Sequence, residues 1–146
     1  MTDRPGLDSR IAAAIRDSFA RQTMMRTLGA TLETLAPGEI RIAAPILPGS
    51  LQQHGHAHAA LAFAIGDSAA GYAALSLMPE GSEVVTAEIK VNFLAPARGE
   101  RLLATGRVIR AGRRLSVVSA EVVAVLQGRD TPVAVLQGTM VPVPPV

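Results

Sequence analysis

Asp67 is the residue whose surroundings in the chain point most directly to chemistry. It lies in the run 61–74, which is made of small and apolar residues, and no Lys or Arg occurs between Arg41 and Lys90. A carboxylate in such a segment is costly unless it is paired, is neutralised or takes part in a reaction. Asp67 is therefore a candidate reactive carboxylate, with a partnered structural aspartate as the alternative.

The segment 52–58, Gln-Gln-His-Gly-His-Ala-His, is the second candidate feature, because it holds all three histidines of the chain. His54, His56 and His58 would share one face if the segment were extended, so metal ligation is conceivable. No fourth ligand stands at a matching spacing, and we therefore expect no metal site.

These residues must be positioned by the elements that the hydrophobic pattern predicts. Apolar residues at spacing four predict an amphipathic helix over 8–21, and the nearly all-apolar run 58–77 predicts a buried helix. Alternating or Val-rich segments predict strands over residues 29–35, 39–46, 85–93, 101–109, 115–126 and 133–141. We expect the last four strands in hairpin succession, with turns at 96–99, 110–114 and 128–130. The fold class is then α+β, a curved antiparallel sheet wrapped around the long helix.

The predicted central helix separates the two candidate features. Since a helix turns about 100° and rises about 1.5 Å per residue, His58 and Asp67 lie about 180° and roughly 13.5 Å apart. A shared reaction therefore requires Asp67 from a second subunit. The first N–H groups of the helix have no intrahelical partner and can polarise a carbonyl. These parts suit acyl-transfer hydrolysis at composite sites in a two-fold dimer.

Composition limits the class of ligand and the cellular compartment that we expect for this chain. The net charge is +2, and six of the thirteen arginines fall between Arg98 and Arg114, which favours an anionic ligand. Scarce aromatic residues and the lack of a basic tail argue against nucleic acid. No Cys is present, so disulfides and thiolate catalysis are excluded. We expect a cytoplasmic protein with no membrane span, since no apolar signal segment is evident and Asp67 interrupts the longest apolar stretch.

The chain resembles the hotdog-fold acyl-CoA thioesterases of the PaaI-like type, which are related to phenylacetic acid degradation. Their central motif is Asn, two residues, Gly, two residues, His-Gly-Gly, and Asp nine positions after the His. The same spacing gives Gln52, Gly55, His58-Ala59-Ala60 and Asp67 here. The segments 68–74, 85–97 and 110–115 also resemble the family's helix, following strand and basic hairpin. The resemblance covers about residues 30–141.

This resemblance implies a role for each matching residue. Asp67 would be the nucleophile or general base across a homodimer, and the Ala59 N–H at the His58 helix start would polarise the thioester carbonyl. Gln52 would assist that carbonyl, and Thr86 would help to place the water. The groove for CoA would be lined by Phe93, Leu94, Ala95, Pro96, Arg98, Arg110, Gly112, Arg113 and Arg114. The length suits one domain over 1–146, and we expect an N-terminal helix within 1–28 and a hotdog core at 29–143. The resemblance implies no metal and no cofactor.

Two departures from the family pattern leave alternatives open. Gln52 replaces Asn, and Ala59-Ala60 replaces Gly-Gly, so a non-catalytic acyl-CoA-binding protein is the competing hypothesis. Without the resemblance, the basic turn 110–114 would be read as a solvated hairpin tip. Tyr72 stands where related hydratases carry His, which disfavours that chemistry. The acyl group, the roles of His54 and His56, and the choice between homodimer and homotetramer are not determined by the sequence.

Overall fold

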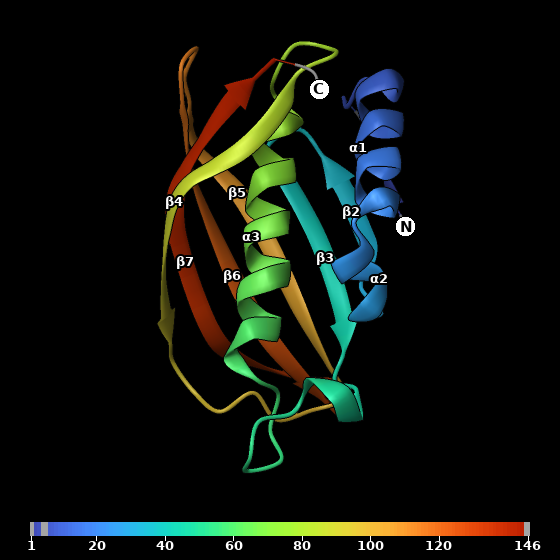
Figure 1. The fold of residues 1–146 in the computed structure, drawn as a ribbon, viewed down its shortest axis with the longest axis vertical. Helices are drawn as coiled ribbons and strands as arrows, with labels where there is room; N and C mark the ends of the chain where they lie inside the picture. Colours follow the sequence, from blue (N-terminus) through green and yellow to red (C-terminus); the bar gives the residue numbers. More distant parts are fainter. Residues whose placement is uncertain (1, 4–5, 145–146) are drawn as a thin grey trace.

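A computed structural model of the chain describes residues 2–3 and 6–144 (Figure 1). Its elements follow one another as β1 (Thr2–Asp3), α1 (Ser9–Arg21), α2 (Thr23–Thr27), β2 (Thr31–Ala36), β3 (Glu39–Pro45), the 3-10 helix η1 (Pro48–Ser50), α3 (Ala59–Leu75), β4 (Glu83–Phe93), β5 (Arg101–Ala111), β6 (Ser116–Leu126) and β7 (Arg129–Val143). A curved sheet surrounds α3, and α1 lies beside β2 at one side of it. The expected α+β hotdog architecture is confirmed.

The sheet has the strand order β1-β2-β3-β5-β6-β7-β4. Every neighbouring pair is antiparallel except β1 with β2. The expected hairpin succession is therefore wrong for β4, which pairs with the last strand β7 at the sheet edge.

The connection after β4 explains this order. Residues 94–100 cross the sheet end, where Leu94 N–H donates to Val133 O, Ala57 N–H to Ala97 O, and Glu100 N–H to Val125 O. Three strand spacings amount to about 14 Å, and an extended segment of this length reaches about 23 Å. The segment that looked like a turn, with Pro96 and Gly99, is thus a crossing strap beside the start of α3.

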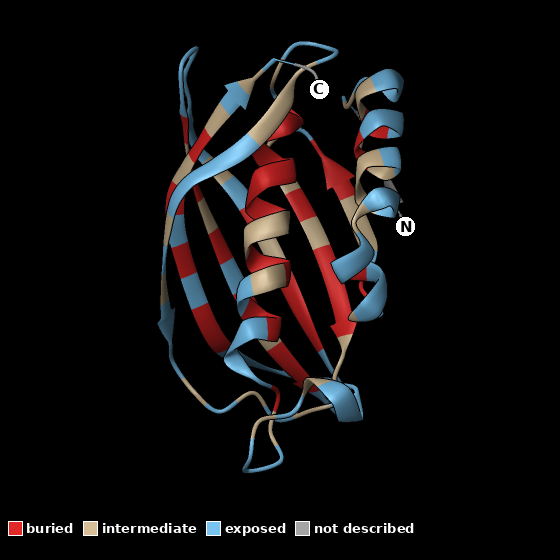
Figure 2. Cartoon of the chain, in the orientation of Figure 1, coloured by how far each residue is buried: buried red, intermediate tan, exposed pale blue. Residues whose placement is uncertain are grey.

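α3 packs directly on the sheet because both surfaces are built from small residues. Its buried side includes Ala69, Ala70 and Ala73, and a Cβ at Gly106 of β5 would overlap the backbone of Ala69 and Ala70. The helix begins after His58 and ends at Leu75, two residues before the predicted end. Figure 2 shows that the part of α3 near its start is exposed on the side away from the sheet.

The N-terminal part is more broken than the single helix expected for 1–28. The Asp8 carboxylate accepts a hydrogen bond from Arg10 N–H at 2.8 Å and caps α1. This bond, followed by that to the Arg10 side chain, lowers the pKa of Asp8. At Gln22 the backbone is extended, so α1 ends there and the short helix α2 follows. Residues 1 and 4–5 lie outside the described part of the chain.

The last hairpin also differs from the prediction. β7 begins at Arg129 rather than at 133, because Gln127 and Gly128 both have positive φ and form a two-residue turn directly after β6. Pro132 is accommodated where the β6–β7 register shifts, as proline is at bulges. In the described residues no helix is long and apolar enough to cross a membrane.

Candidate active site

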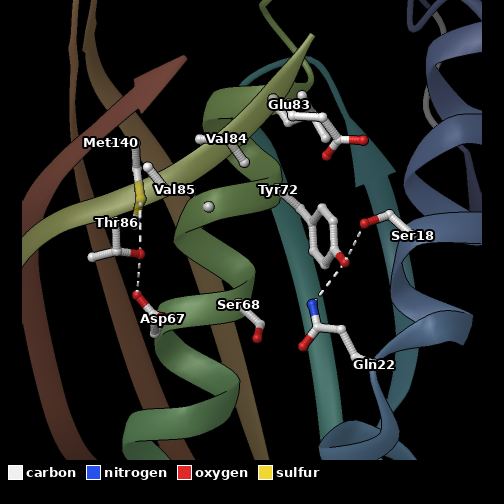
Figure 3. Close-up of a pocket in the computed structure, with 12 residues that line it drawn as sticks. Ser18, Gln22, Asp67, Ser68, Tyr72, Glu83, Val84, Val85, Thr86 and Met140 are labelled. Carbon is white, nitrogen blue, oxygen red and sulfur yellow. Dashed lines mark hydrogen bonds between the residues drawn. The ribbon is translucent and has the colours of Figure 1, made fainter. Parts of the chain in front are cut away.

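Asp67 opens into a small cavity of about 170 Å³ that we call the acid cavity (Figure 3). Residues of α1, α3, β4 and β7 form its walls, with Gln22 from the turn after α1. They are Ser18, Gln22, Asp67, Ser68, Gly71, Tyr72, Leu75, Glu83, Val84, Val85, Thr86 and Met140. Two of them are carboxylates and none is basic, so the cavity carries negative charge near its reactive group.

The Asp67 carboxylate is held by Thr86, in the position that the family resemblance implied. Thr86 Oγ1 donates to Asp67 Oδ1 at 2.8 Å, across the contact between α3 and β4. The Met140 sulfur lies 3.3 Å from the same hydroxyl. The Thr86 hydroxyl has one proton to donate. The Asp67 carboxylate is a stronger acceptor than the Met140 sulfur because it is closer and charged, so the proton is donated to Asp67. This bond fixes the orientation of Asp67, and its other oxygen has no hydrogen-bond donor among the described residues.

Sequence reasoning missed the far end of the acid cavity. Tyr72 Oη accepts a hydrogen bond from Gln22 Nε2 at 2.7 Å and lies 3.0 Å from Ser18 Oγ (Figure 3). A signal existed, because Ser18 and Gln22 continue the stripe of Ile11 and Ile15 on the inner face of α1. Polar residues in an otherwise apolar helix stripe indicate a hydrogen-bonding surface.

A second, larger cavity of about 820 Å³ lies at the start of α3, and we call it the basic groove. It is formed by the loop before α3, the first turns of that helix, the strap and β7. The lining residues are Gln52, His54, His56, Ala57, His58, Ala59, Ala62, Phe93, Leu94, Ala95, Pro96, Ala97, Arg98 and Val133. None of these described residues is acidic. Most of the residues expected to bind CoA are therefore together here.

His58 forms the N-cap of α3. Its Nδ1 accepts a hydrogen bond from Ala60 N–H at 2.9 Å, so in the neutral ring the proton is on Nε2. The Ala59 N–H, one residue earlier, has no hydrogen-bond acceptor among the described residues. Because the positive end of the helix dipole lies here, Ala59 N–H is a ready donor to an oxygen in the groove.

Gln52 makes contacts within its own loop that the sequence did not suggest. Its Oε1 accepts hydrogen bonds from His54 N–H at 2.5 Å and His56 N–H at 3.2 Å. The side chain thereby closes its own loop, in which Gly55 has φ of 80°. The Nε2 of Gln52 is left as the group that can face a ligand.

His56 connects its loop to the strap through a basic side chain. The described residues contain no cluster of three or more possible metal ligands. Arg98 Nε donates to His56 Nε2 at 3.2 Å, which ties the histidine loop to the strap. His56 therefore holds a basic side chain at the groove, and this contact gives it a positioning role that the sequence did not suggest.

The basic hairpin lies far from the groove in the same protomer. Arg110, Gly112, Arg113 and Arg114 line a separate shallow hollow of about 420 Å³. Figure 1 shows the β5–β6 hairpin at the end of the sheet opposite the loop 52–58. β5 spans 11 residues, which is about 33 Å of strand. The two predicted halves of the CoA site are thus not brought together within one chain.

The acid cavity and the basic groove share no lining residue, so His58 and Asp67 do not face a common space in one protomer. Between them lies Phe63, which is 36% exposed on the open side of α3. Next to that side, β4 forms the edge of the sheet and is largely exposed. An apolar side chain and an unpaired strand edge at one place are typical of an interface.

Comparisons with known proteins agree with this architecture. The Thioesterase superfamily model matches residues 54–128. A Halobacterium salinarum protein named "Putative esterase" is 32% identical over 143 residues, covering 92% of this chain and 94% of the relative. The crystal structure of a thioesterase family protein from Silicibacter pomeroyi is 44% identical, with a TM-score of 0.89, and covers 91% of this chain and 98% of that chain.

A fold match extends the comparison. The E. coli PaaI protein from the phenylacetic acid degradation operon has a TM-score of 0.85 at 21% identity, with 97% of this chain and 99% of that chain covered. At that identity the likeness concerns the fold. Family membership supports hydrolase activity on thioesters or esters. The chain belongs to the Thioesterase superfamily, and it has the hotdog fold that it shares with PaaI.

Proposed function

We propose that the protein is an acyl-CoA thioesterase that works as a homodimer with two composite sites. The observation that carries this proposal is the division of the catalytic parts. Asp67 lies in one cavity without a backbone donor for an oxyanion, and the free Ala59 N–H lies in another cavity without an acid. In the proposed dimer, the Ala59 N–H of one protomer completes the acid cavity of its partner, and the Asp67 of the partner completes the basic groove.

The position of Phe63 supports a specific dimer. Asp67 follows it by four residues and Ala59 precedes it by four, so each lies about 6 Å along the axis from Phe63. A two-fold axis that pairs Phe63 with its copy sets the two α3 helices antiparallel. Asp67 of one protomer is then level with Ala59 of its partner, and the exposed β4 edges are next to each other.

The proposed reaction uses groups already oriented. Asp67 attacks the thioester carbonyl carbon, or takes a proton from a water that does so, and Thr86 keeps the carboxylate in place. The Ala59 N–H of the partner stabilises the oxygen that becomes negative, with His58 Nε2–H beside it. The C–S bond then breaks, and CoA leaves as thiolate and takes up a proton. Where Asp67 itself has attacked, water cleaves the resulting acyl–Asp67 anhydride and restores the carboxylate, so in both routes water supplies the oxygen of the free acid. No cofactor is needed for these steps.

CoA itself suits the charge of the surfaces. An antiparallel dimer turns the sheet of one protomer end over end, so its basic hairpin lies at the groove end of the partner. Arg113 and Arg114 have no ion pair among the described residues and are available to phosphate oxygens. Phe93 and the strap residues up to Arg98 offer an apolar wall and one guanidinium group for the pantetheine and adenine parts of CoA.

The test is release of free CoA from a panel of aryl- and alkyl-CoA thioesters. Asp67→Asn keeps the shape and removes the base, and kcat falls by about 10³-fold. Asp130→Asn at the exposed start of β7 is the matched control and retains wild-type turnover. Normal turnover by Asp67→Asn in an intact dimer contradicts the assignment.

A non-catalytic acyl-CoA-binding protein is the second candidate, and one observation favours it. The Gln52 carbonyl oxygen is used inside its own loop, so only its amide nitrogen is left for the substrate. Titration calorimetry with the same panel separates the candidates. Tight binding with no CoA release by the wild type identifies a binder and overturns the thioesterase proposal.

A further inference from the structure

The acid cavity has a far end whose chemistry the proposed reaction does not use. Thr86 and Asp67 stand at one side, and Tyr72, Ser18 and Gln22 at the other (Figure 3). We propose that this end binds the tail of the acyl group, and that it selects a compact, uncharged acyl group with an oxygen at its far end. The inference rests on the proposed thioesterase function and deepens it.

Counting protons at Tyr72 shows why an oxygen fits. The tyrosine oxygen accepts from Gln22 Nε2, and one hydrogen bond joins it to the Ser18 hydroxyl. The hydroxyls of Tyr72 and Ser18 carry one proton each, and the hydrogen bond between them uses one of these two protons. The other proton has no acceptor among the described residues. A polar proton in a half-buried wall gains by meeting an acceptor that the acyl group brings.

The size of the cavity limits the acyl group. Its volume is about 170 Å³, and an engineered apolar cavity of about 150 Å³ holds one benzene molecule. A tail of about six non-hydrogen atoms therefore fits. Ser18 and Gln22 come from α1 and the turn after it, so this N-terminal part closes the end of the cavity against longer chains.

The charge of the walls selects against a second carboxylate. Asp67 and Glu83 both line the cavity, and no Arg, Lys or His is among its described lining residues. An acyl group with a terminal carboxylate would be repelled by both and would find no counter-ion. A hydroxyl or a ketone gains the hydrogen bond without that cost.

The competing explanation is that the cluster only attaches α1 to α3. Phe19 also contacts Tyr72, with ring centroids 6.2 Å apart, so packing contributes to this attachment. A purely structural cluster would affect all substrates equally when it is altered. A recognition cluster changes the ratio between an oxygenated acyl group and its plain counterpart.

The experiment compares hexanoyl-CoA with its 4-oxo, 5-oxo and 6-hydroxy derivatives, and with dodecanoyl-CoA and adipoyl-CoA. The wild type should prefer at least one oxygenated derivative over hexanoyl-CoA by about tenfold in kcat/KM, and disfavour the long and the charged compounds. In Tyr72→Phe and Ser18→Ala, alone and combined, this preference should fall toward unity. Ser9→Ala, at an exposed serine of the same helix, is the matched control and keeps the preference. Melting temperatures confirm that each variant is folded.

The outcomes separate the two proposals. If the wild type releases CoA but treats plain and oxygenated hexanoyl groups alike, this inference is overturned and the thioesterase proposal stands. An unchanged preference in the folded double variant also overturns it. If no thioester in the panel is hydrolysed, the proposed function itself fails, together with the inference that rests on it.

Discussion

The acid cavity and the basic groove differ in charge, in size and in the groups that serve them. The first is small, has two carboxylates and is lined by side chains of four elements. The second is several times larger, has three histidines and an arginine, and contains the start of α3. One chain thus carries both the Asp67 carboxylate and the Ala59 N–H donor on α3, but the two groups face different cavities.

The helix itself explains this separation. In the middle of α3 every backbone N–H is used by the carbonyl four residues earlier, so Asp67 has no free donor beside it. Free N–H groups occur in the first turn, at Ala59. A carboxylate at the helix centre and an oxyanion donor from the same helix cannot meet, and a dimer removes that restriction.

Among the three changes that test this comparison, the largest effect is expected from disrupting the dimer contact that brings the acid cavity of one protomer to the basic groove of its partner. Phe63→Glu puts a charge at the proposed two-fold contact, and two such charges would face each other. We expect a folded monomer by light scattering and a loss of turnover of about 10²-fold or more, because neither region is complete alone. Leu126→Glu, at an exposed leucine that ends β6, is the control and should remain a dimer. A fully active Phe63→Glu monomer would refute the composite site.

A smaller effect is expected at the basic side. The double change Arg113→Ala with Arg114→Ala should raise KM by about tenfold to a hundredfold and leave kcat nearly unchanged. At an exposed hairpin, screening by water is expected to leave the two contacts together with about the value of one charged hydrogen bond, about 1.5–3 kcal/mol. The same change should weaken the salt dependence of KM. Arg129→Ala, at the opposite hairpin, serves as the control. An effect on kcat alone would place these arginines outside CoA binding.

The smallest effect tests the acid side. Thr86→Val removes the hydroxyl that orients Asp67 and should lower kcat by about tenfold, with KM little changed. Thr86→Ser keeps the donor and should recover most of the activity. Equal activity in the Val and Ser variants would show that this hydrogen bond does not position the carboxylate for reaction.

Much of this arrangement could be predicted from the chain. The apolar run was enough to predict the central helix, and the spacing from His58 to Asp67 was enough to predict that these two groups lie apart on it. Thr86 could be placed near Asp67 only through the family resemblance, since it follows Asp67 by 19 positions and a turn lies between them.

The remaining features depend on long-range packing. A strap containing Pro96 and Gly99 has the same local signals as a hairpin turn, so the edge position of β4 was not predictable from those residues. Ser18 and Gln22 acquire a function only when α1 is docked beside Tyr72. The inward turn of the Gln52 carbonyl depends on the backbone of its loop, which Gly55 allows by its positive φ.

One measurement tests the composite site most directly, and it mixes two inactive variants. Asp67→Asn lacks the acid. Ala59→Pro lacks the donor, and Pro is tolerated at this first helical position because His58 is already extended, with ψ of 142°. Ala59→Gly, which keeps the N–H, should stay active.

Co-refolding equal amounts of the two inactive variants forms mixed dimers in which one site has both intact groups. Since random pairing makes half of the dimers mixed, the mixture should recover about a quarter of wild-type turnover. If the mixed dimers form and the mixture is no more active than the sum of the separate variants, the two halves of the site do not come from different protomers.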